Sequence, residues 1–216
     1  MARGMAIVLT LLTLALALFA GWYSSQRSDY FPPELGRTFA ICEHYDGALE
    51  RRLVMDEFED QWFSGELSAF REPSLYARAA SAPRSLRLTW LRSFHDPVVV
   101  RIDSRGDGSA VMTARRRPGG HGFGSQGGVD REQEIVRFLS TAEAVALARI
   151  VDETGLFESP PSGCSCCLDG AQWIIEGVDP HAGYRYRSRQ SPDEGLERVI
   201  GLHLLTLTGW NLEPIY

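Results

Sequence analysis

The chain has 216 residues, 44% hydrophobic and 23% charged, a composition typical of a globular protein with one sizeable core. Its net charge of −6 argues against a nucleic-acid-binding protein, because neutralising phosphates requires a basic surface. All 22 residues counted as Lys or Arg are arginines, which excludes Schiff-base catalysis and a Walker-type phosphate loop, since both require a lysine amine.

The apolar stretch 5–23 predicts a transmembrane or signal helix. Rising about 1.5 Å per residue, such a helix spans roughly 28 Å, close to the thickness of the hydrocarbon core of a bilayer. Trp22 and Tyr23 at its end are typical of a membrane interface. Leu18 stands where a signal-peptide cleavage site prefers a small residue. We therefore expect an uncleaved signal-anchor over 1–24, with a cleaved signal peptide as the alternative.

Residues 25–84 are predicted to form a linker and an N-terminal helical region. Between positions 49 and 63 the apolar residues Val54, Phe58 and Trp62 recur at helical spacing, and the acidic residues fall mostly on the opposite face. We expect a helix over 49–63 whose acidic run is a solvated face and not a pair of acid–base catalysts. Residues 64–84 are expected to be a loop or short helical turns.

The central stretch, 86–117, predicts two strands joined by a tight turn at 105–108. Apolar side chains recur at every second position in 86–90 and in 98–102, the period of a strand with one buried face. Asp107 and Gly108 tolerate the positive φ angles of a hairpin turn. A glycine-rich loop over 118–128 then precedes a strand over 132–139, so its G-x-G-x-x-G match does not open a helix as a dinucleotide site requires.

Two capped helices and a second hairpin complete the prediction. Ser140 and Glu143 form a capping box for a helix that Gly155 ends. Strands are expected over 171–178 and 184–189. The last helix is expected to begin at Ser191 and end near residue 208, with His203 as a core histidine on its apolar face. The predicted fold is therefore α+β: an antiparallel sheet of about five or six strands with two helices packed on one face, preceded by the single N-terminal helix.

The four cysteines are Cys42, Cys164, Cys166 and Cys167. In an oxidising compartment they are expected to form two disulfides, and since neighbouring cysteines rarely bond to each other, Cys42 is expected to pair with one of the other three. Such a bridge closes a loop of more than about a hundred residues, which stabilises the fold by about 4 to 5 kcal/mol in the chain-entropy model.

Metal or redox chemistry is the alternative for this cluster. Three thiolates together with His181 make a closed zinc ligand set, although C-x-C-C is not a usual zinc spacing. Cys164 and Cys167 also have the C-x-x-C spacing of a redox dithiol. Apart from this zinc alternative, no cofactor is expected.

Residues 184–189 alternate aromatic or small residues with arginines. The pattern predicts a half-buried strand whose tyrosines cover the core while Arg185, Arg187 and Arg189 meet solvent. If that strand lies near Arg115, Arg116 and Arg117, the combined basic strip would contact anionic headgroups or envelope polymers.

Three stretches together resemble a family of uncharacterised bacterial exported or membrane-anchored proteins: 102–108 with its R-G-D-G turn, 168–173 (LDGAQW) and 186–192. The resemblance extends over 86–210 and implies an α+β fold and a location in the bacterial envelope, with no activity attached.

We therefore expect a membrane-tethered envelope protein with a non-catalytic interaction or accessory role. Its parts are a signal-anchor or signal peptide over 1–24, a linker and helical region over 25–84, and an α+β domain over 85–216. The expected partners are the membrane, through the N-terminal helix, and an unknown protein or envelope component, with no nucleic acid. A single pass through the inner membrane places the body in the periplasm or outside the cell; secretion after cleavage is the alternative. A cysteine-dependent metal-binding or thiol redox protein is the alternative function.

Overall fold

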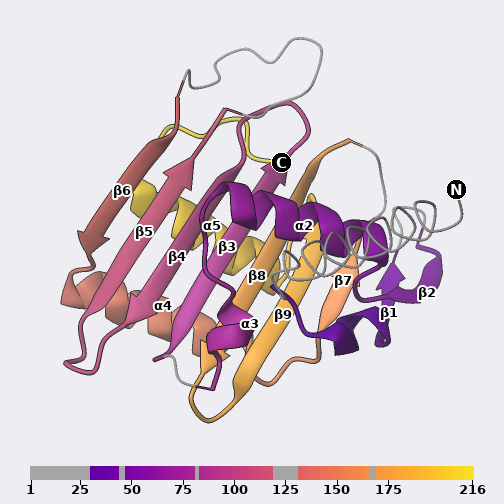
Figure 1. Cartoon of the computed structure of the whole chain (residues 1–216), viewed down its shortest axis with the longest axis horizontal. Coiled ribbons are helices and arrows are strands. Elements are labelled where there is room, and N and C mark those ends of the chain that lie inside the picture. Colours follow the sequence, from indigo (N-terminus) through magenta and orange to yellow (C-terminus); the bar gives the residue numbers. More distant parts are fainter. Residues whose placement is uncertain (1–29, 44–46, 81–82, 119–130, 166–168) are drawn as a thin grey trace, which may run out of the picture.

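The computed structural model describes residues 30–43, 47–80, 83–118, 131–165 and 169–216. Its centre is a seven-stranded sheet with the order β6-β5-β4-β3-β8-β9-β7 (Figure 1). All neighbouring pairs in the sheet are antiparallel except β7 and β9, which are parallel. The strands are β3 (Ser85–Arg92), β4 (Val98–Ser104), β5 (Ala110–Arg116), β6 (Gln133–Phe138), β7 (Ser162–Cys164), β8 (Ala171–Asp179) and β9 (Gly183–Gln190).

A second, two-stranded sheet and helices on both faces surround this centre. β1 (Phe39–Glu43) pairs with β2 (Leu49–Leu53) after a short 3-10 helix, η1 (Pro33–Gly36). Helices α2 (Glu57–Ala69) and α3 (Leu75–Arg78) lie on one face of the large sheet. Helices α4 (Thr141–Thr154) and α5 (Leu196–Thr208) lie on the other (Figure 1).

The predicted α+β class is confirmed, but the predicted architecture is wrong. The sheet has seven strands and not about five or six, it is mixed and not antiparallel, and helices cover both of its faces. The predicted N-terminal transmembrane or signal helix, 1–24, lies outside the described residues. Among the helices of the described ranges, none is long and apolar enough to cross a membrane.

The core on the α4 and α5 side forms as the sequence predicts. Ser140 caps α4 by accepting from Glu143 N, and Gly155 ends it in the left-handed conformation. α5 approaches β8 closely because it carries glycine at the contact: a Cβ on Gly201 would lie 2.5 Å from the Trp173 ring. Trp90 and Trp173 pack with ring centroids 5.3 Å apart at the centre of this core.

The α2 side differs from the predicted helix over 49–63. Leu49–Leu53 is strand β2, and the helix begins only after Asp56, whose side chain accepts from Glu59 N while the Glu59 side chain accepts from Asp56 N. That reciprocal capping fixes the start of α2 four residues after β2 ends. A smaller core packs between α2 and the sheet, including Phe63, Leu67, Ile174 and Tyr186.

Two further boundaries were predicted incorrectly. Residues 86–117 contain three strands, because β3 and β4 are separated by the turn 93–97 and the predicted turn at 105–108 joins β4 to β5. The last helix begins at Leu196 and not at Ser191. Ser191 has a positive φ of 39°, and its Oγ accepts from Ala171 N at 3.0 Å, so it fastens the start of β8 instead of capping α5.

Candidate functional site

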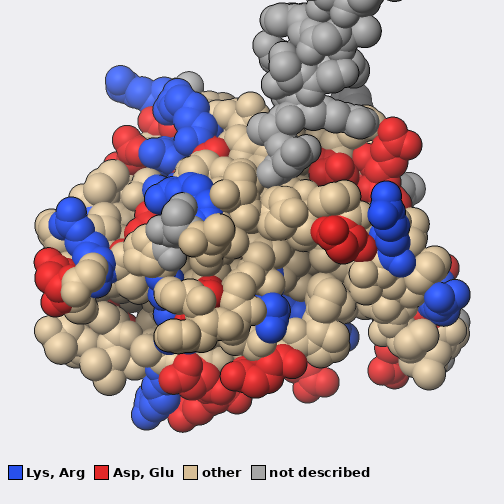
Figure 2. All heavy atoms as spheres, turned by 60° about the horizontal axis from the view of Figure 1, so that its bottom comes forward, with Lys and Arg blue, Asp and Glu red and all other residues tan. Residues whose placement is uncertain are grey.

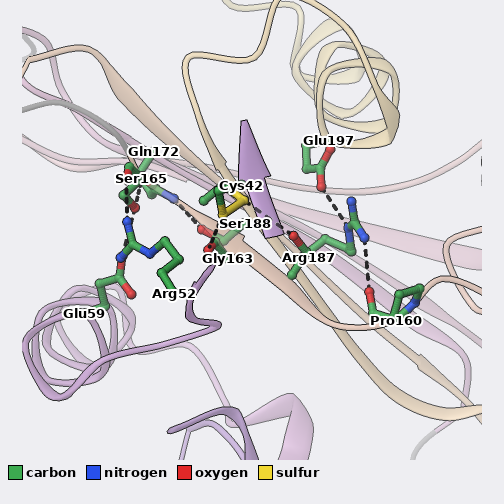
Figure 3. Close-up of a disulfide and its surroundings, with 12 residues drawn as sticks. Cys42, Arg52, Glu59, Pro160, Gly163, Ser165, Gln172, Arg187, Ser188 and Glu197 are labelled. Atoms are coloured by element: carbon green, nitrogen blue, oxygen red, sulfur yellow. Dashed lines mark hydrogen bonds and ion pairs between the residues drawn. A yellow bond between two sulfur atoms is a disulfide. The ribbon is translucent and has the colours of Figure 1, made fainter. Parts of the chain in front are cut away.

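The disulfide joins Cys42 on β1 to Cys164 on β7, with the two Cα atoms 5.6 Å apart (Figure 3). The prediction that Cys42 pairs with one of the three clustered cysteines is thereby confirmed. The bridge spans 122 positions of the chain and fastens the small sheet to the edge of the large one. Cys166 and Cys167 lie outside the described residues.

The chain next to the disulfide is held against α2 by a buried carboxylate. Glu59, 6% exposed, accepts from Arg52 Nη2 at 2.9 Å and from Ser165 Oγ at 2.8 Å. Arg52 Nη1 also donates to the carbonyl oxygen of Ser165, so three side chains from β2, α2 and the cysteine loop meet beside the bridge (Figure 3). Ser165, the residue that follows Cys164, is therefore hydrogen-bonded to both β2 and α2.

His181 and Cys164 lie at opposite ends of β9. His181 is in the β8–β9 turn just before Gly183, and its backbone N donates to Asp179 Oδ1 at 2.8 Å. Cys164 pairs with Arg189 near the other end of that strand. The structure therefore does not bring together these two members of the predicted zinc set. In the ranges that the structure describes, no group of three His, Cys, Asp or Glu residues is arranged to hold a metal ion.

The two groups of arginines also do not form one strip. β4, β3 and β8 separate β5, with Arg115 and Arg116, from β9, with Arg185, Arg187 and Arg189. Arg187 Nε donates to Glu197 Oε1 at 2.8 Å, and Arg117 pairs with Glu66 at 2.5 Å. On the face shown in Figure 2, basic and acidic side chains are interspersed. Most of these guanidinium groups thus have acidic partners within the protein.

A buried charge cluster crosses the α2 face of the sheet, and sequence reasoning missed it. Arg87 on β3 and Glu176 on β8 are opposite each other in the ladder, both fully buried, with Arg87 Nη2 2.6 Å from Glu176 Oε2. Tyr184 on β9 donates to Glu176 Oε1 at 2.9 Å. Burial raises the pKa of the Glu176 carboxyl and, more strongly, that of the Tyr184 hydroxyl.

Glu72, in the connection between α2 and α3, completes this cluster. Its carboxylate contacts three arginines: Arg115 Nη1 at 2.5 Å, Arg87 Nη1 at 3.6 Å, and Arg101 Nη1. Because its side chain is fully buried, the cluster pins the α2–α3 connection to β3, β4 and β5. Every residue of β3 is buried, whereas the alternating pattern indicated one solvated face. No signal within one strand shows that a second layer covers that face.

A cavity of about 340 Å³ lies between α4 and the sheet. Ala144, Ala148 and Val151 of α4 form one wall, and Leu86, Ile102 and Ala110 of the sheet form another. Polar residues also line it, including Arg84, Ser104, Ser109 and Thr141. The volume falls in the range of about 300 to 1,000 Å³ typical of small-molecule sites. Its apolar lining with few polar groups is suited to a ligand with an apolar body and one polar end.

Comparison of the chain with models of known protein families found no match, and comparison with curated proteins found none either.

Proposed function

We propose that the chain is an exported bacterial envelope protein with a non-catalytic binding role, held at the inner membrane by its apolar stretch 5–23 with its body on the outer side. The observation that supports export is the Cys42–Cys164 disulfide. Structural disulfides persist in oxidising compartments such as the periplasm and are rare in the bacterial cytosol. The resemblance of 86–210 to exported or anchored proteins agrees with this proposal.

The test is the redox state and topology of the full chain in bacterial cells. Cells are quenched with acid, and free thiols are labelled with a maleimide of high mass before and after reduction. We expect Cys42 and Cys164 to be labelled only after reduction and the body to be digested by protease added to spheroplasts. Reduced Cys42 and Cys164 together with a protected body would contradict export. Release of the chain by alkaline carbonate would contradict the tether and favour secretion after cleavage.

For the binding role, the cavity beside α4 is the proposed ligand site. Its lining favours a small apolar molecule whose polar end meets the rim near Arg84. Arg84 is 35% exposed and pairs with Asp152 at 3.2 Å and with Asp179 at 3.6 Å. The pair with Asp152 is exposed, so a ligand displaces it at little cost.

The probe for this site is 4-phenylphenol, added to the purified full chain in detergent while the unfolding temperature is measured. A ligand that binds only the folded chain raises that temperature by mass action. We expect the rise in the natural chain and in Ala142→Leu, which changes an exposed α4 position outside the cavity, and its loss in Ala148→Leu, which fills the cavity. An equal rise in both variants, or none in the natural chain, would contradict this site.

The alternative function is thiol exchange or metal binding by the cysteine loop. It is favoured by one observation: the disulfide uses Cys164, which leaves Cys166 and Cys167 two and three positions away in the sequence. A free-thiol count on the denatured, unreduced chain, with zinc analysis on the same sample, separates the two functions. Two free thiols or stoichiometric zinc would support the alternative, and their absence would contradict it.

A further inference from the structure

Strand β6 forms an open edge of the large sheet. It has one neighbouring strand in the part of the chain that the structure describes, β5. Leu139 N donates to Ala110 O at 2.9 Å. In an antiparallel ladder every second residue bonds to the same neighbouring strand, so every second residue of β6, counted back from Leu139, bonds to β5. The backbone N–H and C=O groups of Glu134, Val136 and Phe138 therefore point away from the sheet. The Phe138 carbonyl accepts one bond, from Arg137 Nη1 at 3.2 Å, and keeps a second lone pair.

Two exposed side chains of this edge are apolar, whereas an unpaired edge strand commonly carries groups that prevent further pairing. Val136 is 62% exposed and Phe138 is 59% exposed, and both lie on the α2 face of the sheet, as their partners Thr113 and Val111 show. Natural edge strands are kept from pairing by charged side chains, proline or bulges. β6, QEIVRF, has no proline, and it pairs with β5 in continuous register without a bulge. Its one basic residue, Arg137, binds Glu143 Oε1 at 2.7 Å and the Leu207 carbonyl at 2.9 Å.

We propose that β6 pairs antiparallel with β6 of a second copy of this chain, centred on Val136, to form one continuous sheet across a two-fold axis. A two-fold axis perpendicular to the sheet keeps each side chain on the same face of the sheet in both copies. Residues that stand opposite each other must point to the same face, so they are separated by an even number of positions along β6. With Val136 opposite Val136, Glu134 stands opposite Phe138, and all three outward-facing residues of each strand exchange backbone bonds. A shift in either direction leaves at least one of them unpaired.

The charges near β6 favour the same register. The Arg105 guanidinium lies 5.3 Å from the centre of the Phe138 ring. Glu134 already accepts from Arg115 Nε of its own chain at 2.8 Å. In this register Glu134 of the second copy comes beside Phe138, and Arg105 next to that ring is a second group of opposite charge. The two Val136 side chains contact each other at the axis, and the two Phe138 rings flank them. Self-pairing thus buries the exposed apolar surface of β6 and places opposite charges together.

Disulfide trapping in the full chain tests both the pairing and its register. In a bonded antiparallel pair the Cα atoms are about 5.5 Å apart, which lies inside the range that a disulfide spans. Val136→Cys, made with Cys166→Ser and Cys167→Ser to remove other thiols, should give a covalent dimer in membranes under mild oxidation. Glu134→Cys on the same strand is the matched control, because in this register the two Glu134 Cα atoms are about 14 Å apart.

We expect Val136→Cys to crosslink at least tenfold faster than Glu134→Cys, and a mixture of Glu134→Cys and Phe138→Cys chains to crosslink with each other. Equal rates for Val136→Cys and Glu134→Cys would overturn the proposal.

A second variant measures the association without crosslinking. Val136→Lys places two like charges opposite each other, and we expect light scattering in detergent to show loss of the dimer. Val145→Lys on α4 is the control, because Val145 is 63% exposed and lies on the face of the sheet opposite to Val136. A cooperative unfolding transition, at a temperature that no longer depends on protein concentration, shows that Val136→Lys is folded and monomeric. A dimer that persists in it, or a monomeric natural chain, would contradict self-pairing.

Discussion

Arg87 Nε donates a hydrogen bond to Glu176 Oε2 over 2.7 Å, and neither side chain is exposed to solvent. A buried ion pair contributes little net stability compared with apolar residues of similar size, because both charges lose their hydration. Removing one partner is different, because the remaining charge is then buried without compensation. The pair therefore specifies how β3, β8 and the α2 layer fit together more than it stabilises them.

A double-mutant cycle tests this relationship. Arg87→Met is expected to lower the free energy of unfolding by about 3 to 5 kcal/mol, because Glu176 loses its cationic partner inside the protein. Adding Glu176→Leu should recover part of that loss, since the Pro73 carbonyl still lacks its bond from Arg87 and Tyr184 loses its acceptor. Urea unfolding of the two single variants and the double variant gives the coupling energy. Additive losses would show that the two side chains do not act as a pair.

Loss of the disulfide should be costly because the loop that it closes is long. With 122 positions between Cys42 and Cys164, the chain-entropy model gives a loss of about 5 kcal/mol for Cys42→Ala with Cys164→Ala. A reducing agent should destabilise the natural chain and leave this double variant unchanged. Cys166→Ser serves as the control and should retain the response to reduction, as measured by denaturant unfolding with and without reductant.

The N-terminal turn of α4 should respond to pH through Glu143. Hydrogen bonds from Arg137 and from Ser140 lower the pKa of the Glu143 carboxyl from 4.5 to about 2. Because the folded-state pKa is depressed, this stabilisation is present above pH 4.5 and is lost as the pH falls towards 2. Glu143→Gln should therefore lower the unfolding midpoint at pH 7, and the difference should shrink at low pH. Glu153→Gln, which removes an exposed pair with Arg149, should change the midpoint little at any pH.

His203 should destabilise the fold as the medium becomes acidic. Its Nε2 is buried and has no hydrogen-bond partner among the described residues, and burial lowers the pKa of the imidazole below 6.5, although Glu143 opposes this shift. As the pH falls below 6.5, His203 is therefore protonated in the unfolded chain before it is protonated in the folded chain, and the free energy of unfolding decreases. His203→Leu should raise the free energy of unfolding by about 1 kcal/mol at neutral pH, and the gain should grow between pH 7 and pH 5. A gain independent of pH would mean that the imidazole keeps its ordinary pKa.

Local signals predicted the elements that depend on local chemistry. The capping box of Ser140 and Glu143 and the terminal Gly155 gave α4 almost to the residue, and alternating apolar residues gave β6, β8 and β9. Ser191 shows how such a signal fails: its hydroxyl binds a backbone group of β8, which is distant in the sequence, so the helix begins at Leu196.

The parts that were missed depend on contacts between distant residues. β7 has only three residues, and it forms because it pairs in parallel with β9 and is bridged to β1. A sequence of three residues indicates neither the pairing nor the bridge. Arg87 resembled a solvent-facing residue because its partners, Glu72 and Glu176, lie on other elements. The cysteine pairing was predicted in part, because chemistry limits Cys42 to the clustered cysteines but does not choose among them.

The two edges of the large sheet have different consequences for assembly. At one edge, β7 is only three residues long and is covalently attached to β1, and a Cβ on Gly163 would lie 1.7 Å from the Val54 carbonyl oxygen, so the small sheet lies directly against it. A further strand has little room or template there. Among the described strands of the large sheet, β6 is thus the edge that can accept a partner, and the proposed pairing of two copies uses that edge in both. The chain can therefore form a closed pair without the risk of growing into a fibre.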